Sequence, residues 1–313
     1  MSTSRHKQVK KKQHIVPKCY LANFSDKNGF VWVLHNLHKP IPEQNLFKNK
    51  PKNILIEKNF YTLNFQSGKT SFVIEDTLSN IEGVFSTIFR EKISKQLRLT
   101  DEERAYMSIF IATLWHRTKH SRESFRNSLI DIDRKMNEIK KYIEQNPEAK
   151  RYRSHALGGN SVSFTHTELK EGLENFDNIH SQMTLGAVLD IAPIIYQMKW
   201  SIFYIDDMYC RFITSDHPVS VMRPEAINKY GCNSHGSAPG LIYKDVEMFV
   251  PLSSNAGALL SWKFNKYWYC PIPSDVVDEM NIRTVIHSRN SIVASTSMEF
   301  SRLRMLLNQR INK

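Results

Sequence analysis

The spacing of apolar residues changes twice along this chain, and this change constrains the fold more than any other feature. Between about residues 71 and 198, apolar side chains return every three or four positions, as on the buried face of an amphipathic helix. Before and after this region, runs rich in aromatic and β-branched residues, such as 30–34 and 200–205, are typical of strands. This order predicts an α+β fold, in which β-strands from the N- and C-terminal regions pack against a helical middle section.

Local signals bound the individual elements. Thr100 and Glu103 form a capping box that opens a long helix, which is expected to run, with a break, to about Asn146. Other helices are expected at 71–96, 169–198, 274–287 and 298–312. Further extended segments are expected at 54–63, 210–214, 219–222, 246–252, 256–262 and 291–295, and a loop at 148–166.

The chain carries a formal net charge of +12, and much of that charge lies near its start. Five basic residues with no acid among them precede residue 13: Arg5, Lys7, Lys10, Lys11 and Lys12. Such clusters attract phosphate backbones by counterion release, so Lys10, Lys11 and Lys12 are predicted to bind nucleic acid. The alternative is a solvated terminus without a partner. The pattern predicts a basic disordered arm over 1–12 and a single α+β domain over 13–313, with a helical middle region at about 71–198.

Composition and missing motifs exclude several classes of protein. Hydrophobic residues make up 41% of the chain, which argues against disorder. No apolar stretch approaches the roughly 20 residues that span a bilayer, and no secretory signal is seen, so a cytoplasmic protein without membrane association is expected. The four cysteines form no C-x-x-C pair. The motifs of ATPases, kinases, dehydrogenases and zincins are absent.

Three segments carry recognisable signatures. Residues 13–24 read QHIVPKCYLANF, residues 56–61 read IEKNFY, and residues 212–219 read FITSDHPV. In this order and spacing they resemble domain-of-unknown-function family 4238, with its H-H-x-V-P-x-x-Y-L-x-x-F and T-S-D-x-P-V signatures. The resemblance implies a bacterial, cytoplasmic protein with a role in anti-phage defence and a possible protein partner in such a system. One position departs from the pattern, because Gln13 replaces the first histidine of the family's pair.

His14 is the first candidate catalytic residue. The run His14-Ile15-Val16-Pro17 is similar to the His-Ile-x-Pro run of HNH nucleases, in which the histidine activates water as a general base. Gln13 lacks the charge that would help to hold a metal beside it. The alternative is structural, with His14 and Pro17 fixing the start of the first element.

Asp216 and His217 follow an apolar strand, where polar side chains often form sites. In the functional interpretation, Asp216 is a metal ligand or orients a histidine, and His217 is an acid, a base or a ligand. In the structural interpretation, the pair makes a turn through hydrogen bonds to its own backbone, with an extended conformation imposed by Pro218.

Glu75 and Glu82 would lie on one face of the helix predicted at 71–96. Together with Asp216 they could hold Mg²⁺ or Mn²⁺, because hard cations prefer carboxylate oxygens. They could equally pair with Arg117. Arg117 and Lys18 are predicted to contact phosphate or carboxylate groups.

These candidates lead to a hypothesis with two alternatives. The hypothesis is an effector that acts on nucleic acid, RNA or DNA, as a metal-dependent nuclease in bacterial defence. The first alternative is a non-catalytic regulatory module that binds nucleic acid or protein, and the second is a hydrolase of small molecules. A single active site requires the candidate side chains to lie together.

Overall fold

The computed structural model describes residues 12–36, 45–64, 70–146, 166–207, 209–224, 240–263 and 268–311. Its larger sheet has five strands in the order β12-β7-β11-β10-β9. β12 runs parallel to β7 and the other neighbours are antiparallel. The strands are β7 (Lys199–Tyr204), β9 (Ser220–Met222), β10 (Glu247–Pro251), β11 (Ala256–Ser261) and β12 (Tyr269–Pro271).

A second sheet joins the two ends of the described chain in the order β3-β2-β13-β8. Its strands are β2 (Val31–His35), β3 (Leu46–Asn49), β8 (Thr214–Ser215) and β13 (Ser291–Ala294). N-terminal and C-terminal strands therefore pair directly, and the predicted α+β fold is confirmed. The strand expected at 210–214 is shorter than predicted. Of this segment, only Thr214 and the following Ser215 pair with β13, and these two residues make up β8.

Two short antiparallel pairs complete the β structure. β1 (Lys12–His14) pairs with β4 (Ile56–Lys58), and β5 (Leu63–Asn64) pairs with β6 (Thr70–Ser71). The short helix α1 (Lys18–Ala22) follows β1. Lys12, the last residue of the predicted arm, thus belongs to a strand. Lys10 and Lys11 lie outside the described residues.

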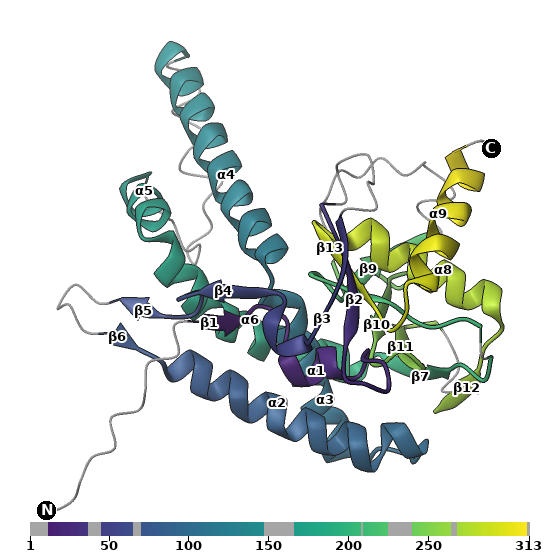
Figure 1. The fold of residues 1–313 in the computed structure, drawn as a ribbon. Helices are drawn as coiled ribbons and strands as arrows, with labels where there is room; N and C mark the ends of the chain where they lie inside the picture. Colours follow the sequence, from purple (N-terminus) through teal and green to yellow (C-terminus); the bar gives the residue numbers. More distant parts are fainter. Residues whose placement is uncertain are drawn as a thin grey trace, which may run out of the picture.

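Three helices form the layer in the lower half of Figure 1: α2 (Val73–Glu91), α3 (Asp101–His116) and α6 (Phe176–Gln197). Their apolar faces meet in the core, where the rings of Phe85 and Phe110 stack with their centroids 3.7 Å apart. The helix expected at 169–198 is two helices, since α5 (His166–Glu174) ends before α6 begins. Pro193 lies inside α6.

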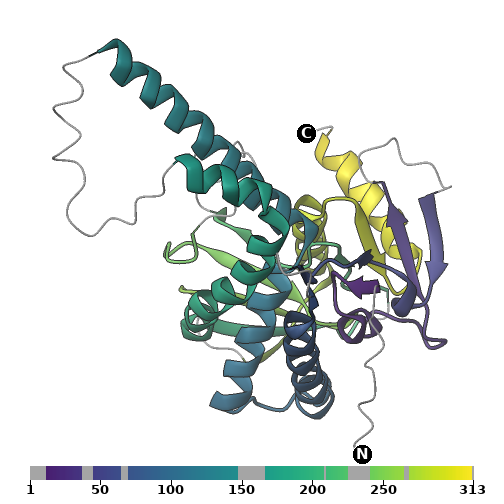
Figure 2. The same cartoon turned by 90° about the vertical axis from the view of Figure 1, so that its left-hand side faces the viewer.

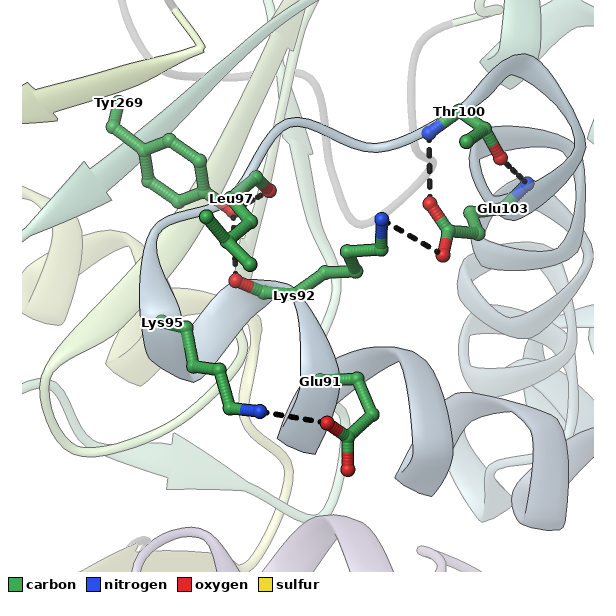
Figure 3. A network of polar contacts seen from close by, with 7 residues as sticks. All are labelled: Glu91, Lys92, Lys95, Leu97, Thr100, Glu103 and Tyr269. Atoms are coloured by element: carbon green, nitrogen blue, oxygen red, sulfur yellow. Dashed lines mark hydrogen bonds and ion pairs between the residues drawn. The ribbon is translucent and has the colours of Figure 1, made fainter.

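The predicted capping box closes the connection between α2 and α3 (Figure 3). Thr100 Oγ1 accepts the Glu103 N–H, and the Glu103 carboxylate accepts the Thr100 N–H at 2.8 Å. The same carboxylate pairs with Lys92. Tyr269 of β12 donates its hydroxyl to the Leu97 carbonyl, which ties this connection to the larger sheet.

The predicted break in the long helix is also confirmed. α3 ends at His116, and α4 (Lys119–Gln145) begins after Thr118, whose side chain accepts the Ser121 N–H as an N-cap. Two further helices, α8 (Ser274–His287) and α9 (Met298–Ile311), lie near the predicted bounds. Both contribute to an apolar cluster on one face of the four-stranded sheet, and the opposite face contributes to a cavity.

Candidate functional site

A cavity of about 470 Å³ opens between the β1–β4 pair, the four-stranded sheet and the first turn of α4. One wall comes from the sheet and the loop before β13, and the opposite wall from the segment that leads into β4. Its polar lining consists of His35, Asn53, Glu57, Lys119, Glu123, Asp216, Arg289, Asn290 and Ser291. This volume is within the range of small-ligand sites.

A continuous chain of hydrogen bonds runs along the sheet wall. The Asp216 carboxylate accepts the Asn290 N–H at 2.9 Å, and the Asn290 side-chain amide lies 3.2 Å from Nε2 of His35. Nδ1 of His35 lies 2.8 Å from the Ser291 hydroxyl. His35 and Ser291 are directly opposite each other in the β2–β13 pair, so the sheet register fixes this contact. A histidine held at both ring nitrogens has a defined orientation toward the cavity.

Asp216 is the predicted site residue that lines the cavity itself. Burial raises the pKa of its carboxyl, and the backbone N–H groups of Arg289, Asn290 and Ser291 act in the opposite direction. Asp216 also donates its own N–H to the Ser291 carbonyl. The carboxylate therefore orders the loop that carries Asn290 and Ser291 into the cavity wall.

Two ion pairs stand at the cavity, Lys119 with Glu57 and Arg289 with Glu123. All four side chains are between 37% and 47% exposed. Pairs in such solvent-exposed positions contribute little, about 0–1 kcal/mol. An incoming anion can therefore replace either carboxylate at low cost, and the guanidinium and ammonium groups suit phosphate oxygens.

His217 lies behind the wall, fully enclosed by protein. Its Nδ1 is 2.7 Å from the Thr118 hydroxyl, and its ring centroid is 4.6 Å from that of His120. Burial holds the pKa of His217 well below its ordinary value, so the imidazole is neutral. The Ser215 hydroxyl accepts the His217 N–H, which is the turn chemistry expected of this segment. His217 thus connects the strand end to the corner between α3 and α4.

Two of the signature segments meet in the core: the first is residues 13–24 and the second is residues 212–219. The hydroxyl of Tyr20 lies 2.8 Å from that of Thr214 and donates to the Pro251 carbonyl at 2.7 Å. Ile15 from the first segment and Asp216 from the second both line the cavity. A family model described as a protein of unknown function (DUF4238) matches residues 12–298. The chain belongs to the DUF4238 family. No curated protein and no solved structure matches it.

Gln13, at the position where the DUF4238 signature has histidine, has a structural role in this chain. Its side-chain carbonyl accepts the Tyr61 N–H at 2.7 Å, and its amide donates to Thr62 and to the Glu75 carboxylate at 3.1 Å. Gln13 is 2% exposed. One of the predicted metal ligands, Glu75, is therefore engaged by this amide.

The other helix carboxylate, Glu82, pairs with Arg117 at 2.8 Å. Arg117 also donates to the His14 carbonyl at 2.7 Å and lies under the Tyr61 ring. The structure thus shows the alternative in which Glu82 forms a salt bridge with Arg117. His14 lies in the same cluster, and burial lowers the pKa of its imidazole. The neighbouring Glu82 carboxylate raises this pKa, whereas the positive charges of Arg117 and Lys18 lower it.

Six of the predicted site residues of the DUF4238 chain therefore fall into two groups. His14, Lys18, Glu82 and Arg117 lie together beside α2, whereas Asp216 lies at the cavity with His217 behind it. Within the part of the chain that the structure describes, no three His, Cys, Asp or Glu side chains gather as a metal ion would require. Among those residues, no helix is long and apolar enough to cross a membrane.

Sequence reasoning missed His35, Asn290 and Ser291. Each stands at the end of a correctly predicted strand or directly before one, a position where polar side chains often gather. The pairing of β2 with β13, across 256 positions, brings them to Asp216. No local sequence pattern predicts that two strands so far apart in the sequence will pair.

Proposed function

We propose that this protein acts on nucleic acid and cleaves phosphodiester bonds at the cavity. The observation that carries the proposal is the chain of hydrogen bonds from Asp216 through Asn290 and His35 to Ser291, placed where Lys119 and Arg289 can hold a phosphate. The net charge of +12 supports a polyanionic substrate, because it attracts phosphate backbones over long range.

Phosphodiester cleavage needs a proton taken from the attacking oxygen and one given to the leaving oxygen. An imidazole nitrogen can accept a proton and return it, and His35 lines the cavity, so we assign this task to His35, whose Nε2 would exchange the Asn290 amide for the substrate. Asn290 and Ser291 position its ring. Arg289 and Lys119 would neutralise the negative charge of the phosphate as the bond breaks.

Dependence on Mg²⁺ or Mn²⁺ stays a prediction. The side-chain geometry does not favour the predicted ligand set, since Glu75 is bound by Gln13 and Glu82 by Arg117. Asp216, the third predicted ligand, has its two oxygens occupied by backbone N–H groups of Arg289 and Asn290.

The test is cleavage of labelled tRNA, single-stranded RNA and plasmid DNA, with Mg²⁺, with Mn²⁺ and with EDTA. His35→Gln and Asp216→Asn run beside the wild type, and Asp245→Asn is the matched control, because Asp245 pairs with Arg223 away from the cavity. Glutamine keeps a polar side chain at position 35 but cannot exchange a proton. We expect both cavity variants to lose cleavage while Asp245→Asn keeps it.

Cleavage that persists in both cavity variants would refute the site. If no nucleic acid is cleaved but all are bound in a salt-sensitive manner, the non-catalytic binding module is the better description. A place in anti-phage defence, and a protein partner in such a system, are separate proposals; phage plating on cells with wild type and His35→Gln tests the first of them.

A further inference from the structure

The cavity changes from apolar to charged across the sheet that forms one of its walls. Phe47 of β3 is directly opposite Val33 of β2. Two residues further along β2, His35 is directly opposite Ser291 of β13. All four side chains line the cavity, and the loop before β13 adds Arg289. The wall therefore begins with an aromatic side chain at the edge of the sheet and ends at a cation that is proposed to hold phosphate.

Phe47 leaves much of its apolar surface uncovered at the cavity. It lies on β3, the edge strand at the right of Figure 2, and is 41% exposed. No aromatic ring or cation among the described residues is in ring contact with it. The opposite wall presents Ile54, Leu55 and Ile56. This end of the cavity thus suits a flat apolar group, which could stack on the Phe47 ring.

The separation of the two ends matches the length of a nucleotide. Ser291 is two strands across the sheet and two residues along it from Phe47. With about 4.8 Å between strands and about 3.4 Å per residue, their Cα atoms lie about 12 Å apart. A nucleotide has a flat base at one end and a phosphate at the other. With its phosphate at Arg289, its base reaches toward Phe47.

We propose that the substrate is a single strand of nucleic acid, one unpaired base of which stacks on Phe47 inside the cavity. This inference rests on the proposed function, since it places the phosphate of that nucleotide at Lys119 and Arg289. A base within a duplex is paired and stacked, so it must be turned out of the helix before it can enter a cavity. A single strand presents its bases without this cost, and stacking on an aromatic ring accepts every base.

Lysines next to the charged end favour a strand over a free nucleotide. Glu57 of β4 pairs with Lys119 at the cavity, and the next residue, Lys58, is directly opposite Lys12 of β1. Both Lys58 and Lys12 are exposed, and neither has an acidic partner among the described residues. Like charges directly opposite each other destabilise a pair of strands. A further phosphate of the bound strand would relieve this repulsion, whereas a nucleoside monophosphate has its one phosphate inside the cavity.

The experiment measures equilibrium binding by filter binding of radiolabelled strands of about 12 nucleotides, a length within the range of single-strand sites. EDTA is present, and the full chain is used. RNA and DNA are each tested as a single strand, as a blunt duplex and as a sugar–phosphate strand without bases. Nucleoside monophosphates serve as competitors, and we expect them to displace the single strand only at far higher concentrations than an unlabelled strand does.

Phe47→Leu removes the ring and keeps an apolar side chain on β3, whereas Phe47→Trp keeps a ring. We expect Phe47→Leu to weaken single-strand binding roughly tenfold, through the loss of one stacked base, and to leave the binding of duplexes and base-free strands unchanged. Phe47→Trp should bind as the wild type does. Tyr106→Leu is the matched control, because Tyr106 is 44% exposed and lies on α3 outside the cavity lining. Circular dichroism checks that each variant keeps its fold.

Lys58→Gln tests the path of the strand beyond the cavity. Repeating the measurement over a range of salt concentrations should show that it lowers the slope of log K against log salt by about 0.7, as expected for one lost phosphate contact. Lys141→Gln, at an exposed position on α4, is the control and should keep the wild-type slope. An unchanged slope in Lys58→Gln would overturn this path.

Single-strand binding that is unchanged in Phe47→Leu would overturn the inference. An equal loss for base-free strands, or competition by monophosphates as strong as that by strands, would overturn it as well. The cleavage assay with His35→Gln separates this failure from that of the proposed function. Cleavage that requires His35, with unchanged binding by Phe47→Leu, supports the nuclease and overturns the stacked base. Binding that requires Phe47, without cleavage, supports the stacked base and overturns the nuclease.

Discussion

Replacing Arg117 by Met distinguishes a structural from a phosphate-binding role for this residue. The guanidinium is only 3% exposed, and it pairs with Glu82 and donates to the backbone carbonyl of His14. Met preserves much of the volume but leaves the Glu82 carboxylate and that carbonyl without their donor. Removing one partner of a buried ion pair costs about 3–5 kcal/mol, because the other charge stays desolvated. Glu82 is 24% exposed and can recruit water, so we expect the lower end, about 3 kcal/mol.

The assay is urea denaturation followed by tryptophan fluorescence, with the slope of the transition compared between variants. Arg134→Met is the control, because Arg134 is 61% exposed and its pairs with Asp131 and Glu138 lie at the surface, so its loss should cost less than about 1 kcal/mol. A loss below about 1 kcal/mol for Arg117→Met, accompanied by weaker nucleic-acid binding, would refute this reasoning and support the phosphate contact.

Three further predictions concern stability, and urea denaturation checks each. Tyr20→Phe should cost about 2 kcal/mol, because the Thr214 hydroxyl and the Pro251 carbonyl lose a buried partner. Thr100→Ala should cost about 1 kcal/mol by removing the N-cap of α3, whereas Thr100→Ser should cost little. Burial lowers the pKa of His116 and of His180 to about 4 and that of His217 well below normal. The unfolded chain therefore binds more protons, so the free energy of unfolding should fall as pH drops from about 7 toward 4, and a flat profile would contradict this.

The parts of the fold that local sequence determines were predictable. Thr100 and Glu103 form the expected capping box because both partners lie within one turn. The strand ending at His35 and the strand beginning at Ser291 follow from their aromatic and β-branched residues. Which strands pair is a different matter, because it depends on contacts between distant segments.

The candidate site shows the same limit. Asp216 could be proposed because it follows a strand, and it lines the cavity. Glu75 and Glu82 could be placed on one helix, but sequence spacing cannot show which donor reaches each carboxylate. In the structure, the Gln13 amide donates to Glu75, and Arg117 pairs with Glu82. Long-range packing thus decides whether a polar side chain supports the fold or faces a ligand.

The sheet that joins β2 to β13 also has a consequence for how the chain is made. His35 and Ser291 are 256 positions apart, so β2 leaves the ribosome long before β13, one of its two partner strands, has been made. Contacts between residues so far apart in the sequence form slowly, and a strand that stays exposed until its partner is made promotes aggregation. The cavity wall can be completed only when residue 294 has emerged. A product that stops before Asn290 would lack Asn290 and Ser291 and with them the proposed site, so any activity on nucleic acid would have to wait until both residues have been made.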